Sequence, residues 1–189
     1  MDALLLLTAD HNRVRGLFTR FKAAHEAEDT ATMTEVGLTI LDELAVHTEI
    51  EEQVFYTAVR QASKELEEGV AEGVEEHHVV DVLAAEIKAL PVDDEAWAAK
   101  MTVLIENVEH HVGEEEEEMF PQSRGALGAA ALAELGEQLE AMKAELGAPT
   151  VADKQALTTD ELHKLATAQE IPGRSSMDRE ELLATVAPV

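Results

Sequence analysis

Apolar residues recur at intervals of three and four through nearly all of the first 147 residues. This spacing gathers side chains on one face of an α-helix. Five such stripes lie within residues 7–21, 36–58, 70–87, 101–119 and 132–146. Candidate caps and helix breakers separate them, namely Asp29 or Thr30, Ser63, Pro91 with Asp93 or Asp94, and Pro121. Because short connections favour antiparallel neighbours, we predict an all-α, up-down-up-down four-helix bundle with a fifth helix packed on its outside.

The composition supports helices and restricts the chemistry. Aromatic residues make up only 3% of the chain, which suits a helical core of aliphatic side chains. Forty acidic against fourteen basic residues give a formal charge of −26. Such a surface repels phosphate groups, which argues against nucleic-acid binding and against docking on anionic membranes. The chain has no cysteine, so disulfides, thiolate catalysis and cysteine-ligated metal sites are excluded.

The chain carries no pattern that predicts a membrane or an export signal. No apolar stretch has the length of a membrane span. The short apolar run in residues 1–7 lacks the basic start and the cleavage site of a signal peptide. We therefore expect a soluble, cytoplasmic protein.

The periodicity divides the chain into two parts. We expect residues 1–149 to form the bundle and residues 150–189 to form a small C-terminal segment. In that segment the pattern predicts a short helix over residues 159–165 with Thr158 or Thr159 as its cap, a loop at residues 171–175, and a second helix over residues 178–186. The segment is too small to bury much core of its own.

Each of the first four stripes is interrupted by one histidine in helical register with its apolar neighbours. Two of the stripes add a glutamate one turn later. The six inward positions are His11, His47, Glu51, His77, His111 and Glu115. The other histidines have outer registers, with His78 and His110 at the rim and His25 and His163 facing solvent, and the run Glu114–Glu118 is otherwise a solvated face.

A buried carboxylate without a partner costs several kcal/mol, and two that face each other cost more. A pair of di- or trivalent metal ions would offset this cost best, because carboxylates can bridge two ions while imidazoles cap them. The alternative is a buried network of His–Glu ion pairs without metal.

Four motifs follow one another along the chain: His11, His47-Thr48-Glu49-Ile50-Glu51, His77 and His111-Val112-Gly113-Glu114-Glu115. Together they resemble the hemerythrin-like HHE cation-binding domain over about residues 1–146. The resemblance implies a non-haem di-iron site in a four-helix bundle, with two iron ions joined by an oxo or hydroxo bridge. It implies that the four histidines are terminal ligands and that Glu51 and Glu115 bridge the ions.

One position departs from the oxygen-carrying members of that family, which have a fifth histidine one turn after the histidine ligand of the third helix, here His77. Here that position is Asp81. Asp81 would add a ligand or orient a bound water, and the alternative is a helix-surface acid. A more open and more anionic site favours ferric iron and peroxide chemistry over oxygen carriage.

We therefore expect a redox-active di-iron protein that decomposes or senses hydrogen peroxide, with a catalase-like activity. The alternatives are reversible binding or sensing of O₂ or NO without turnover, and iron storage or delivery. Phe55, Tyr56 and Phe120 are candidates for the surroundings of the metal site.

The C-terminal segment resembles the small Rho N-terminal or SAP-like helix–loop–helix module. The resemblance rests on Leu157–Leu162, Ile171–Ser175 and Glu180–Leu183. That module often contacts nucleic acid, but this copy lacks the basic and aromatic residues that such contacts need. We expect it to dock a protein partner instead.

Overall fold

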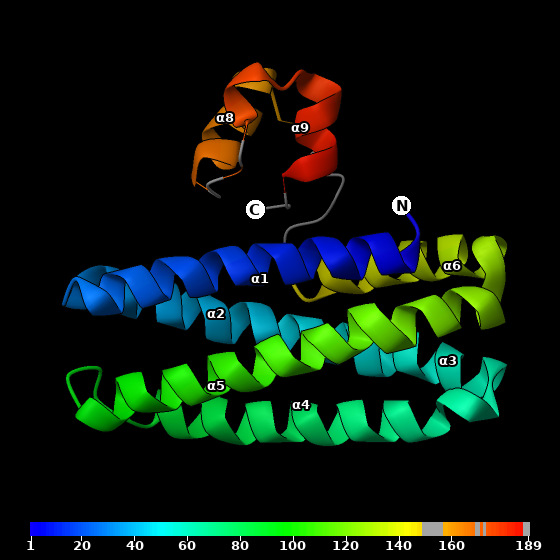
Figure 1. Ribbon diagram of the computed structural model, residues 1–189, viewed down its shortest axis with the longest axis horizontal. Helices are drawn as coiled ribbons and strands as arrows, with labels where there is room; N and C mark the ends of the chain where they lie inside the picture. Colours follow the sequence, from blue (N-terminus) through cyan, green and yellow to red (C-terminus); the bar gives the residue numbers. More distant parts are fainter. Residues whose placement is uncertain (149–156, 169–170, 172, 187–189) are drawn as a thin grey trace.

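Four long helical stretches lie side by side in the computed structural model (Figure 1), which describes residues 1–148, 157–168, 171 and 173–186. Within these residues every regular element is a helix, so the prediction of an all-α bundle is confirmed. The elements are α1 (Ala3–Glu26), α2 (Thr30–Ile50), η1 (Glu51–Tyr56), α3 (Thr57–Ala62), η2 (Lys64–Leu66), α4 (Glu67–Lys88), α5 (Glu95–Glu114), η3 (Glu115–Met119), α6 (Phe120–Glu145), α8 (Thr159–Ala168), η4 (Arg174–Ser176) and α9 (Arg179–Thr185).

Aspartates begin three of the long helices. The carboxylates of Asp2, Asp29 and Asp94 accept hydrogen bonds from backbone N–H groups of the first turns of α1, α2 and α5. Such bonds satisfy amides that have no partner inside the helix. Ser63 caps the short 3₁₀ turn η2, which leads into α4. The sequence thus located the starts of α2 and α5 correctly, with Asp29 and Asp94 as the capping residues.

Two of the long stretches each contain a π-helical segment. η1 joins α2 to α3, and η3 joins α5 to α6, without a break in the helical path. The predicted stop at Pro121 is therefore wrong. Pro121 occupies the first turn of α6, directly after η3. The change from i→i+5 to i→i+4 bonding at that point leaves backbone groups unpaired in any case, so the missing N–H of proline costs little there.

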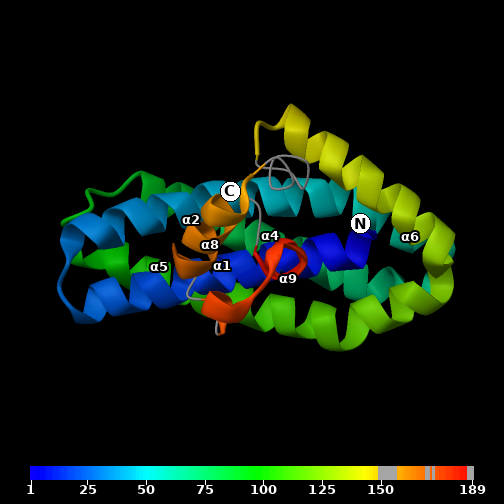
Figure 2. The same ribbon diagram turned by 90° about the horizontal axis from the view of Figure 1, so that it is seen from above.

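The helical path turns at Gly128 instead. Its φ of 75° and ψ of 168° interrupt α6, and only glycine adopts this conformation readily. The second half of α6 then runs back obliquely across the outside of the bundle (Figure 2). It buries Leu132, Leu135 and Leu139. This is the outer fifth helix that the sequence predicted.

The core consists of two apolar clusters. One contains Phe18, Ile40 and Trp97 with their neighbours from α1, α2, α4 and α5. The other contains Leu7 and Phe55 with residues of α1, η1, α4 and α6. Between the two clusters lies a layer of buried polar side chains, and this layer contains the candidate site.

The C-terminal helices α8 and α9 pack against each other through Leu162, Ala166, Leu182 and Val186. Thr158 and Asp178 cap them, each in a reciprocal pair of hydrogen bonds with a glutamate three residues later. Both helices lie where the sequence predicted them. Parts of the segment, residues 149–156, 169–170, 172 and 187–189, lie outside the described residues. The division at residue 150 and a docking role for the segment stay predictions.

Among the described residues, no helix combines the length and the apolar character needed to cross a membrane.

Gly37 allows the indole ring of Trp97 to approach α2. A Cβ at position 37 would lie 2.5 Å from Trp97 Cη2, whereas a Cβ at Gly16 on α1 would have no neighbour within 4 Å. We predict that Gly37→Ala lowers the free energy of unfolding. Overpacking against Trp97 costs about 1–3 kcal/mol, whereas the higher helix propensity of alanine over glycine stabilises the helix by at most about 1 kcal/mol. Gly16→Ala is the matched control and should raise the free energy of unfolding, because it adds helix propensity without a clash. Thermal denaturation monitored by circular dichroism checks both, and equal shifts for the two variants would contradict the packing.

Candidate metal centre

Six buried side chains meet in the polar layer, and each long helical stretch contributes to the group. They are His11 from α1, His47 from α2, Glu51 from the start of η1, His77 from α4, His111 from α5 and Glu115 from the start of η3. None is more than 5% exposed. The structure therefore brings together all six inward positions that the sequence singled out.

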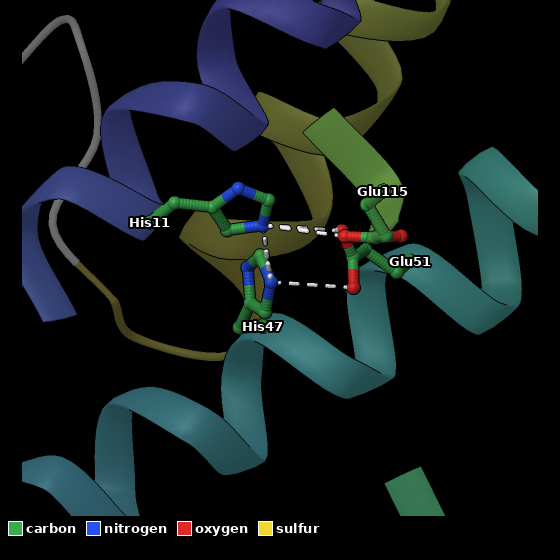
Figure 3. Close-up of side chains that lie close together, drawn as sticks. All are labelled: His11, His47, Glu51 and Glu115. Atoms are coloured by element: carbon green, nitrogen blue, oxygen red, sulfur yellow. Dashed lines mark hydrogen bonds and ion pairs between the residues drawn. The ribbon is translucent and has the colours of Figure 1, made fainter. Parts of the chain in front are cut away.

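The four imidazoles form two pairs. The Nε2 atoms of His11 and His47 lie 3.2 Å apart, and those of His77 and His111 lie 3.1 Å apart. In both pairs the rings meet edge to face. Figure 3 shows the first pair with the two glutamates beside it. All four Nε2 atoms thus point toward the interior of the bundle.

Each glutamate faces both histidine pairs. Glu51 Oε2 lies 3.2 Å from His47 Nε2 and 3.4 Å from His77 Nε2. Glu115 Oε2 lies 3.3 Å from His11 Nε2 and 3.6 Å from His111 Nε2. The two oxygens of Glu51 and Oε2 of Glu115 are buried and have no hydrogen-bond partner of good geometry. These oxygens are therefore available to hold a cation.

The opposite ring nitrogens of three histidines contact a second set of carboxylates. The Nδ1 atoms of His11, His77 and His111 lie 2.9, 3.0 and 2.7 Å from oxygens of Glu116, Glu52 and Glu76, respectively. An ionised carboxylate can only accept, so each Nδ1 donates, and in the neutral ring Nε2 then has the lone pair that can bind a cation. Arg15 in turn donates two hydrogen bonds to Glu116.

Sequence reasoning missed these three supporting glutamates. Glu116 had been placed on the solvated face of the run Glu114–Glu118, but it lies against His11. A signal was present, because each supporting residue directly follows or precedes an inward residue: Glu52 follows Glu51, Glu116 follows Glu115, and Glu76 precedes His77. Which histidine each one supports depends on packing between helices.

His47 is supported differently. Its Nδ1 lies 4.0 Å from Asp10 Oδ2 and has no hydrogen-bond partner of good geometry. The buried ammonium group of Lys143, on the outer half of α6, contacts both oxygens of Asp10 at 2.5 and 2.7 Å. Burial opposes the charge on Asp10, but His47 and Lys143 outweigh it and lower the pKa of its carboxyl group. The outer half of α6 thus places the positive charge of Lys143 against Asp10, the acid nearest to His47 Nδ1.

The π segments explain how consecutive glutamates take different roles. η1 begins at Glu51 and η3 begins at Glu115, each four residues after a histidine of the group. A π turn holds more residues than an α turn, so consecutive side chains are separated by a smaller rotation. Glu51 and Glu52 can therefore both face the neighbouring helices, and Glu115 and Glu116 likewise.

Without bound metal, attraction between the imidazoles and the carboxylates dominates the electrostatics of the group. Burial disfavours the charged form of His11, but its close contacts with the carboxylates of Glu115 and Glu116 outweigh burial and raise the pKa of His11 to about 9. The pKa values of His77 and His111 also rise against their burial, because carboxylates lie beside them. The same contacts outweigh burial at Glu115 and lower its pKa to about 2. Protons on imidazoles and metal cations therefore compete for the same negative environment.

The aromatic residues that the sequence suggested surround the centre. Tyr56 donates a hydrogen bond of 2.8 Å to Glu115 Oε1 and stacks on His77. Burial and the nearby carboxylates raise the pKa of Tyr56 well above its usual value, so it stays a donor. Phe120 stacks on His11, and Phe55 packs edge-on against Phe120.

The remaining candidates lie away from the centre. Asp81 is exposed on α4 and belongs to none of the three groups of potential ligands among the described residues, so the structure does not bring it together with the other candidates. The inward face of α4 continues from His77 in a step of three to Val80, which turns Asp81 outward. His78, His110 and His25 are exposed, and His163 is half-buried.

A groove leads from the surface to one side of the centre. It has a volume of about 250 Å³ and lies between α4 and the stretch formed by α5, η3 and α6. His111 and Glu115 form part of its wall, together with Gly69 and Gly73. At Gly73 a Cβ would lie 2.7 Å from the Tyr56 hydroxyl. A glycine at this position thus leaves room for both Tyr56 and the groove.

Comparisons with known proteins agree with this geometry. The sequence model of the hemerythrin HHE cation binding domain matches residues 2–123. No curated protein sequence gives a match. Among solved structures, a hemerythrin HHE cation binding domain-containing protein from Mycobacterium kansasii is similar, with a TM-score of 0.63 and 22% identity over 98% of this chain and 99% of that chain. The family model covers well over half of the chain, and the buried His–Glu cluster supplies suitable ligands for a cation. The chain is thus a metal-binding protein that belongs to the hemerythrin HHE cation-binding family.

Proposed function

We propose that this protein holds two iron ions, one at the pair His11 and His47 and one at the pair His77 and His111, with Glu51 and Glu115 bridging them. One observation carries the proposal: two pairs of converging Nε2 atoms are spanned by two buried carboxylates, and three of the four carboxylate oxygens lack a hydrogen-bond donor of good geometry. A network of ion pairs without metal would leave those oxygens with contacts of poor geometry.

The spacing of the donors fits one ion per pair. Metal–nitrogen bonds of about 2.0–2.1 Å place two adjacent ligands of an octahedral ion about 3 Å apart. The observed separations within the pairs are 3.2 and 3.1 Å. Imidazole and carboxylate ligands together suit iron, although they suit other first-row metals as well.

We further propose that the centre reacts with hydrogen peroxide. Two octahedral ions offer twelve positions, of which four histidines and two bridging carboxylates would fill eight and an oxo or hydroxo bridge two more; about two would remain for water or small oxygen species. Iron would supply the redox chemistry that no side chain of the group provides. The supporting glutamates make the imidazoles more basic, which favours the ferric state.

The side chains around the centre would orient its ligands and restrict access. Tyr56 holds the carboxylate of Glu115 through its hydrogen bond and presents a neutral hydroxyl to the interior. Phe120 covers His11 and excludes water from that side. The groove at His111 and Glu115 gives small molecules a route to the other side.

Metal analysis and an optical spectrum of protein purified without chelators test the proposal. We expect two irons per chain, charge-transfer bands of a bridged di-iron centre, and release of O₂ from added hydrogen peroxide. A stable spectral change with O₂ or NO in the absence of peroxide turnover would assign a binding or sensing role instead. A stoichiometry far above two would indicate iron storage, and no bound metal would contradict the proposal.

Removal of a bridging carboxylate should affect both ions. We predict that Glu51→Ala lowers iron occupancy to one ion or none, whereas His77→Ala removes one terminal bond and leaves partial loading. Glu49→Ala is the matched control, because Glu49 is an exposed glutamate two residues away. Asp81→Ala should also retain full loading. Iron content per folded chain checks the order, and loss of iron in Glu49→Ala alone would contradict the assignment.

The stability of the metal-free protein should depend on pH in a defined way. The raised pKa of His11, about 9 against 6.5, contributes stability that is complete below about pH 6.5 and is lost as pH rises through 9. The lowered pKa of Glu115, about 2 against 4.5, contributes stability that is complete above about pH 4.5 and is lost as pH falls toward 2. We predict that the melting temperature of the metal-free protein falls between pH 6.5 and 9.

The metal-loaded protein should not show this loss of stability over the same range. Metal binding requires neutral imidazoles, so the stabilisation by metal should grow as pH rises from 6.5 to 9. Differential scanning calorimetry with and without bound metal measures both trends. Parallel pH profiles for the two forms would show that the metal does not bind at these histidines.

A further inference from the structure

A third group of potential ligands lies at the surface beside the centre. The carboxylates of Glu76 and Glu114 and the imidazole of His110 place one ligand atom each within 4.8 Å of one another. His110 Nε2 lies 3.3 Å from Glu114 Oε1 and 4.0 Å from Glu76 Oε1. The side chains of His110 and Glu114 are 67% and 46% exposed, so a hydrated ion can reach them.

Glu76 connects this group to the buried centre. Its Oε2 accepts the 2.7 Å hydrogen bond from His111 Nδ1, while its Oε1 faces His110. One carboxylate and one imidazole ring therefore separate the surface group from the interior. Sequence reasoning had treated His110 and Glu114 as rim and surface residues, and only the packing of α4 against α5 places Glu76 between them and His111.

A groove connects the surface group with the buried centre. Glu76 and Glu114 belong to its wall, and so do the buried ligands His111 and Glu115. The buried Oε2 of Glu115 has no hydrogen-bond partner of good geometry and lies 3.6 Å from Nε2 of His111, another residue of this wall. Among the described residues, the groove is lined by seven glutamates and by neither lysine nor arginine. Carboxylates gathered in this way attract cations and raise their local concentration.

We propose that Glu76, His110 and Glu114 form an outer binding site for a divalent cation, from which metal passes along the groove to the buried centre. The hand-over rests on the proposed two-ion centre, but the outer site does not. Two carboxylates and one imidazole, with water in the remaining positions, bind a divalent ion weakly and exchange it readily. An ion that reaches the centre in this way exchanges its water for protein ligands in steps.

The test uses Co²⁺ as the probe, because its visible absorption reports ligation. The full-length metal-free protein is compared with the double variant His110→Ala/Glu114→Gln. The matched control is His78→Ala/Glu75→Gln, which makes the same chemical changes at exposed positions of α4. Equilibrium dialysis measures the stoichiometry, and stopped-flow absorption measures the rate of loading at limiting Co²⁺. Melting temperatures verify that all three proteins are folded.

We expect the parent and the control to bind one weak Co²⁺ in addition to the two buried ions. The double variant should lose only the weak ion, and its buried centre should fill at least about tenfold more slowly. An unchanged weak site in the double variant overturns the outer site. Loss of the weak ion with an unchanged loading rate overturns the hand-over. If the parent binds only one weak ion and the double variant none, the outer site stands and the proposed two-ion centre fails.

Discussion

The burial of two carboxylates in the middle of the bundle is the constraint on which the rest of the structure depends. Glu51 and Glu115 lie in a layer between two apolar clusters, where an uncompensated charge costs several kcal/mol. Positive charge must reach this layer as protons on imidazoles or as metal ions. Each helical stretch therefore contributes one histidine at the same depth, and the bundle is held together at its centre by polar contacts as well as by apolar packing.

The outer carboxylates make this layer a binding site with defined donor directions. Because Glu52, Glu76 and Glu116 accept from the Nδ1 atoms, three Nε2 atoms point toward the centre, where each can carry a proton or bind a cation. His47 differs, because the nearest carboxylate to its Nδ1 is that of Asp10, which accepts hydrogen bonds from Lys143. The two halves of the centre are thus chemically unequal, and the outer half of α6 contributes to that difference although it lies outside the four-helix bundle.

The π segments show how local backbone geometry serves the site. Each begins at a glutamate of the central layer, and each allows the next glutamate to support a histidine on another helix. A regular α-helix would turn the second glutamate further away. These segments also carry the helical path past Pro121, so the chain turns at Gly128 instead, and α6 reaches the position from which Lys143 contacts Asp10.

The sequence alone determined the features that depend on local periodicity. Apolar spacing defined the helices, aspartates and Ser63 defined several of their starts, and the register of six polar residues among apolar neighbours placed them on inner faces. The tertiary structure decided what depends on contacts between helices. It paired His11 with His47 and His77 with His111, and it turned Asp81 outward because the face of α4 continues through Val80. It also placed Glu76 between two groups of ligands, since no spacing along one helix specifies which residue of another helix lies opposite.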